Sequence, residues 1–323
     1  MTDAAIAWLR TPEAIRARSA NVLAAAERGA LRHFAIERER LDAAADYVIA
    51  TMRASYPDLA VPYHSRWRHF AVGGRDRWAM LAETQPALGA QEIARIRFDL
   101  AVVSVFLDAG AGDAWRYVEP ATGAVLARSE GLAVASLDLF AAGACSADPA
   151  RPLRADAAAL AAIDRDTLAG AFQVRGDNPL AGLDGRALLL RRLGESMWGK
   201  AMFGRPARIG HLFDHLAGRA NDGRLPALAI LAAVLEGFSE IWPGRIELAG
   251  VNLGDVGRHP EAGGEGPSAG HVPVPKLSQW LAYSLVEPLE EAGIEVTDLD
   301  RLTALAEYRN GGLLIDFGVL VPR

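Results

Sequence analysis

Apolar residues recur at helical spacing along the N-terminal part of the chain. Thr11-Pro12-Glu13 places a cap residue, a first-turn proline and a first-turn carboxylate in order, and apolar positions then follow at helical spacing until Gly29. Residues 38–55 show the same amphipathic pattern, which ends before Tyr56-Pro57. This pattern predicts two packed helices.

The rest of the chain also shows mainly helical patterns. Residues 93–107 are apolar on nearly every side, which favours a buried helix. We expect further helices at residues 132–140, 155–163, 184–193, 225–238 and 277–292. Residues 115–117 and 124–126 flank Thr122-Gly123 as a short hairpin, residues 244–270 are mostly glycine-rich loop, and residues 313–321 are expected to form a terminal strand.

These elements predict a mainly α fold: a compact helical protein with a few short strands or hairpins. No internal repeat or low-complexity linker marks a boundary. At 323 residues the chain can bury a large core. We therefore expect a single large domain over residues 1–323, or two intimately packed helical lobes whose boundary the sequence does not define.

Composition and charge exclude several classes of protein. Hydrophobic residues make up 51% and charged residues 23%, which is typical of a compact globular chain rather than a disordered or fibrous one. The net charge of −6, without a basic block, argues against nucleic-acid binding. Residues 1–10 lack the pattern of a secretory signal, and no apolar run approaches the roughly 18 residues of a membrane span. We expect no membrane partner and a cytoplasmic location.

Familiar catalytic motifs are absent or incomplete. The single Cys145 lacks the flanking residues of known cysteine enzymes. His211 and His215 have the spacing of two metal ligands on a helix, but Leu212 stands where a metalloprotease has Glu and no third ligand is apparent, so we propose no metal. Residues 266–270 match Gly-x-Ser-x-Gly without a preceding apolar strand, and no dinucleotide or phosphate-loop fingerprint is present.

Polar and aromatic residues occur together in four short segments that carry the candidate chemistry: residues 64–69, 128–131, 275–280 and 307–312. Arginine can hold phosphate or carboxylate in a bidentate manner, lysine supplies a point charge, and tryptophan or tyrosine can stack on a planar ring. Together these residue types resemble a site for a small, planar, anionic ligand; the alternative is a set of buried ion pairs and caps. The candidate binding residues are His64, Arg66, Trp67, Arg128, Glu130, Lys276, Gln279, Trp280, Glu287, Tyr308 and Arg309.

Two carboxylates are the candidate catalytic residues. Asp255 lies in a glycine-rich turn, and Asp316 interrupts an apolar run after residues 313–315. Irregular, glycine-rich backbone lets a ligand approach closely, and burial of a carboxyl group raises its pKa toward the range that acid–base catalysis needs. Other acidic residues are expected to be turn caps or arginine partners.

Five segments of the chain carry recognisable signatures: Tyr63-His64-Ser65-Arg66-Trp67-Arg68-His69-Phe70, residues 107–112, residues 128–133, Lys276-Leu277-Ser278-Gln279-Trp280-Leu281 with residues 283–285, and Glu307-Tyr308-Arg309-Asn310-Gly311-Gly312. Together they resemble a family shared by fungi and bacteria that is associated with the ring-opening route of uracil catabolism. The resemblance runs from about residue 11 to the C-terminus. It departs from the family pattern at Pro275, where a histidine is expected, and at Gly257, where a tryptophan is expected.

The family resemblance implies a pathway, in which uracil passes through its ribonucleotide and the pyrimidine ring is opened by a separate enzyme. The helical outline is also similar to queuosine-nucleotide N-glycosidases, which implies a fold like that of helical DNA glycosylases. We therefore expect hydrolysis of the N-ribosidic bond of a uracil-derived ribonucleotide, intact or ring-opened, without a metal or organic cofactor. Asp255 or Asp316 would act at the sugar carbon, Lys276, Arg309 and Arg66 would hold phosphate, and Trp67, Trp280 or Tyr308 would pack the ring.

Two other functions stay open at this point. The protein could bind a pathway intermediate or the ring-opening enzyme without catalysing a reaction, which would show as stoichiometric binding without turnover. It could instead be a metal-dependent amidohydrolase acting on a ureido group, which would require metal at His211 and His215.

Overall fold

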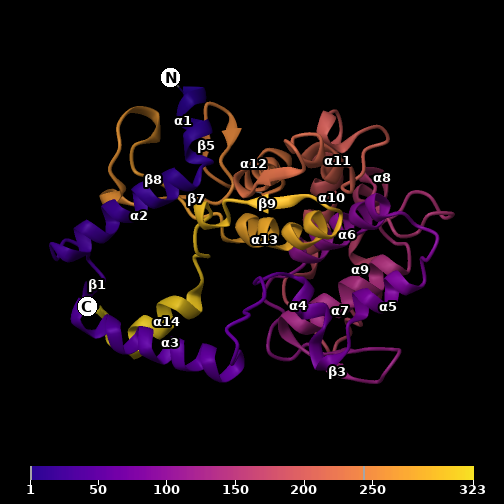
Figure 1. The fold of residues 1–323 in the computed structure, drawn as a ribbon, viewed down its shortest axis with the longest axis horizontal. Helices are drawn as coiled ribbons and strands as arrows, with labels where there is room; N and C mark the ends of the chain where they lie inside the picture. Colours follow the sequence, from indigo (N-terminus) through magenta and orange to yellow (C-terminus); the bar gives the residue numbers. More distant parts are fainter. Residues whose placement is uncertain (1, 243) are drawn as a thin grey trace. The chain divides into compact units, whose positions relative to one another are not determined.

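The computed structural model describes residues 2–242 and 244–323 (Figure 1). Fourteen α-helices, joined by short 3₁₀ turns and by strands of two or three residues, make up the described part of the chain. These strands associate only in pairs. The predicted mainly α fold is confirmed. No helix among the described residues has the length and hydropathy that crossing a membrane requires.

The described chain divides into two compact units. The first unit comprises residues 2–63, 245–276 and 302–323. The second unit comprises residues 64–242 with 244, and residues 277–301. Each unit is described separately below.

The first unit contains the two N-terminal helices that the sequence predicts. After α1 (Thr2–Leu9), helix α2 (Pro12–Glu27) begins at Thr11, whose Oγ1 accepts a hydrogen bond from the backbone N–H of Ala14 at 3.2 Å. The second predicted helix is α3 (Leu41–Ser55), which α14 (Tyr308–Asp316) flanks in Figure 1. Strands β1 (Phe34–Ile36) and β10 (Leu320–Pro322) pair antiparallel.

The terminal strand predicted over residues 313–321 is wrong in its first half. Residues 313–316 continue α14, which begins at Tyr308, and only Leu320–Pro322 is extended. A short apolar run does not distinguish strand from helix, and the polar residues before it belong to the same helix. The helix ends at Phe317 because Gly318 adopts a left-handed φ of +69°.

The glycine-rich segment of the first unit is loop with short hairpins, as predicted. Its strands are β5 (Glu247–Leu248), β6 (Val251–Asn252), β7 (Val256–Arg258) and β8 (His271–Pro273). Ser268 lies in a 3₁₀ turn, Gly266–Ser268, and its Oγ accepts a hydrogen bond from the buried Arg18 at 3.1 Å. The Gly-x-Ser-x-Gly string is therefore part of a structural turn.

The second unit is built on the predicted buried helix, α6 (Ala90–Phe106), in which every residue from Ile96 onward is buried. The hairpin predicted beside it forms from β2 (Tyr117–Val118) and β3 (Val125–Leu126). The other elements of the unit are α4 (Trp67–Phe70), α5 (Arg77–Glu83), α7 (Arg128–Ala141), α8 (Ala157–Ala162), α9 (Arg165–Ala171), α10 (Leu183–Met197), α11 (His211–Ala217), β4 (Arg224–Pro226), α12 (Ala227–Phe238), α13 (Lys276–Glu291, from Leu277 onward) and β9 (Glu295–Thr297).

Helix α10 packs closely against α8 at Gly194. A Cβ atom at this position would overlap the carbonyl oxygen of Ala157 and lie 2.6 Å from the backbone nitrogen of Ala161. Both partners are backbone atoms, so neither can move without shifting α8. Gly185 lies on the same helix, and a Cβ atom there would meet nothing within 4 Å.

We predict opposite effects for Gly194→Ala and Gly185→Ala on the free energy of unfolding. The change at Gly194 should lower it by about 1–3 kcal/mol because the helices must separate. The change at Gly185 should raise it by about 0.5–1 kcal/mol because alanine restricts the unfolded chain. Urea unfolding followed by circular dichroism measures both. Equal effects at the two positions would contradict the packing described.

Candidate functional site

Arg66 is fully buried and joins three helices of the second unit. Its Nε donates to Ser104 Oγ on α6 at 2.7 Å, and its Nη1 forms an ion pair with Asp108 Oδ2 at 3.0 Å. Its backbone N–H donates to Ser284 Oγ on α13 at 2.9 Å. Nη1 also lies 3.4 Å from the carbonyl oxygen of Ser129, in the first turn of α7. Arg66 therefore connects α6 and α7 through its side chain and α13 through its backbone.

Two buried serines continue this network between α6 and α7. Ser104 Oγ, which accepts from Arg66, lies 2.6 Å from Ser136 Oγ. Ser136 Oγ in turn donates to the carbonyl oxygen of Ala133 at 2.8 Å. Because the last bond uses the Ser136 hydroxyl proton, Ser104 must donate to Ser136. The donor and the acceptor of each hydrogen bond from Arg66 through Ser104 and Ser136 to Ala133 are thus determined, and the guanidinium is held in one orientation.

Helix α13 holds the segment that carries Arg66. Ser65 Oγ donates to Glu287 Oε2 at 2.6 Å, and Arg68 forms an ion pair with the other oxygen of Glu287. Trp67 Nε1 donates to the carbonyl oxygen of Ser284 at 2.7 Å, and the Arg97 guanidinium carbon lies 4.1 Å from the centre of the Trp67 ring. Trp67 and Glu287 therefore hold the Arg66 segment in place.

The Trp280 ring is the centre of the site. The His64 ring stacks on it with centroids 6.0 Å apart, and the His69 ring meets it edge-on at 5.6 Å. The Arg66 guanidinium carbon lies 5.6 Å from the same ring. Trp280 is 6% exposed, so these groups surround a nearly buried indole.

Three buried nitrogens in this cluster have no hydrogen-bond partner among the residues that the structure describes. They are Arg66 Nη2, His69 Nδ1 and Trp280 Nε1. A buried N–H group without an acceptor costs about 1–3 kcal/mol, so native structures rarely leave one unpaired unless a ligand or water supplies the acceptor. Three such atoms around one indole ring are the strongest sign of a binding site in the second unit.

The charges around Arg66 are balanced by two carboxylates. Asp108 pairs with it directly, and Glu130 in the first turn of α7 attracts it electrostatically. Burial and the positive charge of Arg66 lower the pKa of His69 below its ordinary value. The imidazole is therefore neutral at pH 7 and can donate at one nitrogen while accepting at the other.

Gly131 allows the first turn of α7 to pack closely against the hairpin because it has no Cβ atom. A Cβ atom at this residue would lie 2.9 Å from the Trp115 ring and 3.1 Å from the carbonyl carbon of Leu126. Only glycine permits this approach, which positions Ser129 and Glu130 beside Arg66. Arg128 begins the helix with a left-handed φ of +52° and an exposed side chain.

Comparison with known proteins gives the family of the chain. Residues 8–323 match the family described as Protein of unknown function (DUF1688). The chain belongs to this family. It is 37% identical over 329 aligned residues to "Protein urg3" of Schizosaccharomyces pombe, covering 100% of this chain and 79% of that protein. It is also 37% identical over 305 residues to "Uracil catabolism protein 4" of Lachancea kluyveri, covering 89% of this chain and 70% of that protein. The family resemblance drawn from the sequence is confirmed.

Several predicted site residues of this DUF1688 chain lie in the first unit. Asp255 is partly buried and forms an ion pair with Arg245 at 3.2 Å; burial raises its pKa above the ordinary value, and Arg245 partly offsets this. Asp316 is exposed at the end of α14. Lys276 forms an ion pair with Glu307, whose pKa this contact lowers. Tyr308 and Arg309 are both exposed.

Four of the five segments that carry the family resemblance therefore contribute to the Arg66 cluster, and residues 307–312 belong to the other unit. Gln279 is buried on α13. The catalytic role expected of Asp255 or Asp316 stays a prediction.

His211 and Cys145, which the sequence offered as a metal ligand and a nucleophile, have contacts or burial typical of structural residues. His211 Nδ1 lies 2.7 Å from the carbonyl oxygen of Phe203. Cys145 is fully buried, and burial raises the pKa of its thiol to about 12. Within residues 2–242 and 244–323, no group of three or more His, Cys, Asp or Glu side chains is placed to hold a metal ion.

The candidate residues drawn from the sequence leave out several polar residues of the Arg66 cluster. Ser104 and Ser136 lie in no candidate segment, whereas Ser284 and His69 occur only within the segments that carry the family resemblance. A signal for Ser104 is present, since it is a hydroxyl within the largely apolar run of residues 93–107. A buried hydroxyl needs a partner, so its position indicates an internal hydrogen bond.

We predict that Ser284→Ala lowers the free energy of unfolding by about 1–3 kcal/mol, because the buried N–H of Arg66 then loses its acceptor. Ser196→Ala is the matched control. Ser196 is half-buried on α10, and its Oγ donates only to the carbonyl oxygen of Leu193 in its own helix. Its replacement should change the free energy by less than about 0.5 kcal/mol. Denaturant titration measures the free energy of unfolding of both variants. Indistinguishable unfolding midpoints would contradict the predicted difference between them.

Proposed function

We propose that this chain acts in uracil catabolism by hydrolysing the N-ribosidic bond of a uracil-derived ribonucleotide, intact or ring-opened. The pathway is supported by the 37% identity to "Uracil catabolism protein 4" over 89% of this chain. The reaction is supported most by the three unpartnered nitrogens around Trp280. Arg66 Nη2 and Trp280 Nε1 provide donors for the oxygen atoms of a planar, polar ligand beside an aromatic surface, and His69 Nδ1 can donate or accept according to the tautomer.

The donors and the aromatic surface of the cluster suit the chemical groups of such a substrate. A pyrimidine ring or its opened ureido remnant is planar and carries carbonyl oxygens, which Arg66 Nη2 and Trp280 Nε1 can bind. His64 already stacks on Trp280, so a flat group can extend or replace that stack. In this proposal Arg66 binds the substrate through its one free nitrogen, while its other nitrogens stay in the structural network.

The chemistry requires a carboxylate near the sugar carbon. When the C1′–N bond breaks, its electron pair goes to nitrogen, which must be protonated, and C1′ develops positive charge until water adds to it. A carboxylate stabilises that charge and takes the proton of the water. Glu130 is the candidate in the second unit, since it is half-buried and close enough to Arg66 and His69 to influence both.

His69 is the candidate for a hydrogen bond to a carbonyl oxygen of the leaving group, because its neutral imidazole can donate an N–H there while the leaving nitrogen takes its proton from water. Its imidazole has one ring nitrogen without a partner and lies against Trp280. Asp255 and Asp316 of the first unit remain the carboxylates expected from the sequence, and Lys276 and Arg309 remain the expected phosphate ligands. The variants below distinguish these assignments.

The activity test is incubation of the purified protein with uridine monophosphate, alone and together with the ring-opening enzyme, followed by mass analysis for ribose phosphate. Release by the protein alone is expected for the intact nucleotide, and release only with the enzyme for the opened form. Stoichiometric binding without release would instead indicate a non-catalytic partner and overturn the proposal.

We predict that Glu130→Gln lowers kcat by at least about 100-fold while leaving the fold intact, because the neutral amide cannot stabilise the positive charge at C1′. Glu83→Gln, at an exposed position of α5, is the matched control and should keep full activity. Asp255→Asn and Asp316→Asn are measured in parallel. Loss of activity in either of these, with Glu130→Gln active, would transfer the catalytic role to the first unit.

We predict that Trp280→Phe raises KM about 10-fold or more, because the ring is kept and one N–H donor is removed. The control is Trp198→Phe, a change at a tryptophan that is 58% exposed. Steady-state kinetics with each variant measure the effect. An unchanged KM in Trp280→Phe would show that the indole N–H does not contact the substrate.

A further inference from the structure

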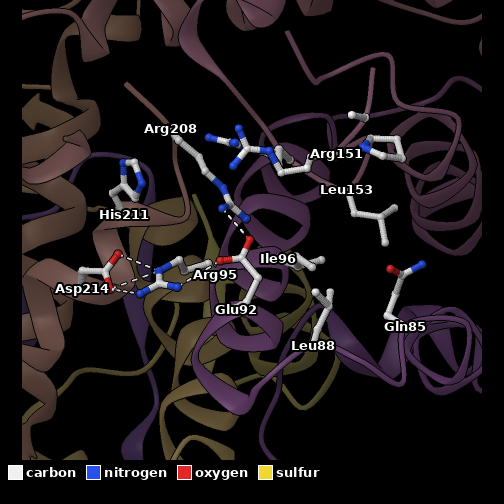
Figure 2. Close-up of a pocket in the computed structure, with 13 residues that line it drawn as sticks. Gln85, Leu88, Glu92, Arg95, Ile96, Arg151, Leu153, Arg208, His211 and Asp214 are labelled. Atoms are coloured by element: carbon white, nitrogen blue, oxygen red, sulfur yellow. Dashed lines mark hydrogen bonds and ion pairs between the residues drawn. The ribbon is translucent and has the colours of Figure 1, made fainter. Parts of the chain in front are cut away.

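A pocket of about 400 Å³ lies in the second unit, apart from the Arg66 cluster. It is formed by the first half of α6, residues 150–154 and the segment from Arg208 to Asp214 (Figure 2). Glu92 on its wall precedes Ser104 of the Arg66 cluster by twelve residues on α6, which corresponds to a rise of about 18 Å. The two sites therefore use different ends of one buried helix.

Four arginines line this pocket, and two of them have buried nitrogens without a hydrogen-bond partner. Arg208 is 3% exposed; its Nε donates to Asp99 Oδ2 at 2.7 Å and its Nη1 to Glu92 Oε1 at 2.7 Å, which leaves Nη2 unpaired. Arg154 is also buried; its Nη2 pairs with Asp156 at 3.1 Å, and its Nε has no acceptor. Two of the arginines that line the pocket thus have a nitrogen without an acceptor among the described residues.

The carboxylates of the pocket are already occupied. Asp214 accepts two hydrogen bonds from Arg95 Nε and a third from its Nη2, and Glu92 accepts from both Arg95 and Arg208. Behind Arg208, the carboxylate of Asp99 is occupied as well: its Oδ2 accepts from Arg208 Nε at 2.7 Å, and its Oδ1 accepts from the backbone N–H of Gly210 at 2.6 Å. A ligand of this pocket is therefore expected to supply oxygen acceptors rather than a positive charge.

The other side of the pocket is apolar. Figure 2 shows Leu88, Leu153 and Ile96 facing the space across from the guanidinium groups of Arg208 and Arg95. A pocket of this size, with an apolar side and a few charged groups, is typical of sites for small organic molecules. The volume also exceeds what an inorganic oxyanion alone would fill.

We propose that this pocket is a second small-molecule site. Its ligand is a small organic molecule with a phosphate or carboxylate group, which Arg208 and Arg154 bind, and an apolar or aromatic body, which packs on Leu88, Ile96 and Leu153. The proposed hydrolysis at the Arg66 cluster does not need this site, so either proposal can fail without the other.

Titration calorimetry of the full chain with phenyl phosphate, benzoate, inorganic phosphate and benzylamine tests the proposal. Phenyl phosphate or benzoate should bind at least 10-fold more tightly than inorganic phosphate, and the tighter of the two identifies the anionic group. Benzylamine should not bind. Preference for benzylamine, equal affinity for inorganic phosphate, or no binding of either aromatic anion would overturn the proposal.

Matched variants locate the binding. Leu88→Glu places a negative charge at the pocket and should weaken the tighter aromatic anion at least 10-fold, whereas Leu188→Glu, at a similarly exposed leucine of α10, should not. Arg151→Glu should weaken binding as well, with the exposed Arg165→Glu as its control. Leu88 and Arg151 are both partly or largely exposed, so the variants should fold. Binding that is unchanged in Leu88→Glu but lost in Trp280→Phe would place the ligand at the Arg66 cluster and overturn the proposal.

Discussion

The burial of the Arg66 guanidinium is the constraint on which the second unit depends. An unpaired charge in a protein interior costs several kcal/mol, and an arginine cannot escape this cost by losing its proton. The structure meets the cost with a carboxylate at Asp108, a serine on α6, a carbonyl oxygen at the start of α7 and aromatic rings. These partners come from the C-terminal end of α6 with the residues after it, from the start of α7 and from the aromatic rings beside them, so one side chain fixes the positions of several segments.

The hydrogen-bond network leaves one nitrogen of the buried Arg66 guanidinium without an acceptor. Nε and Nη1 of Arg66 have acceptors, whereas Nη2 does not, and the neighbouring Trp280 and His69 each have a ring nitrogen in the same condition. A purely structural arginine would be stabilised by saturating all three nitrogens. Leaving donors unpaired beside an aromatic ring reduces the stability of the free protein and increases its affinity for a ligand that supplies oxygen acceptors. The proposed substrate supplies them.

Local patterns predicted most of the helices, because caps, glycine stops and apolar spacing act over a few residues. Thr11 as the cap of α2, the buried helix α6 and the hairpin around Thr122-Gly123 are confirmed. The strand predicted at residues 313–321 failed because a short apolar run fits either period.

The site was harder to predict than the helices. The backbone of Arg66 meets Ser284 across 218 residues, and no local pattern encodes such a contact. The sequence also could not show that Asp255 and Asp316 belong to a different unit from the Arg66 cluster.

Arg66 and Arg208 lie outside α6 but bind to it in the same way. Both are almost fully buried, both have Nε bound to an acceptor on α6 and Nη1 bound to a carboxylate, and both leave Nη2 without a partner. Because the guanidinium is planar, fixing two of its nitrogens also fixes the direction in which the third points. A buried arginine held in this way loses little further conformational entropy when it binds an oxygen atom. The rigid, buried α6 thus pre-orients a donor at each of its two ends.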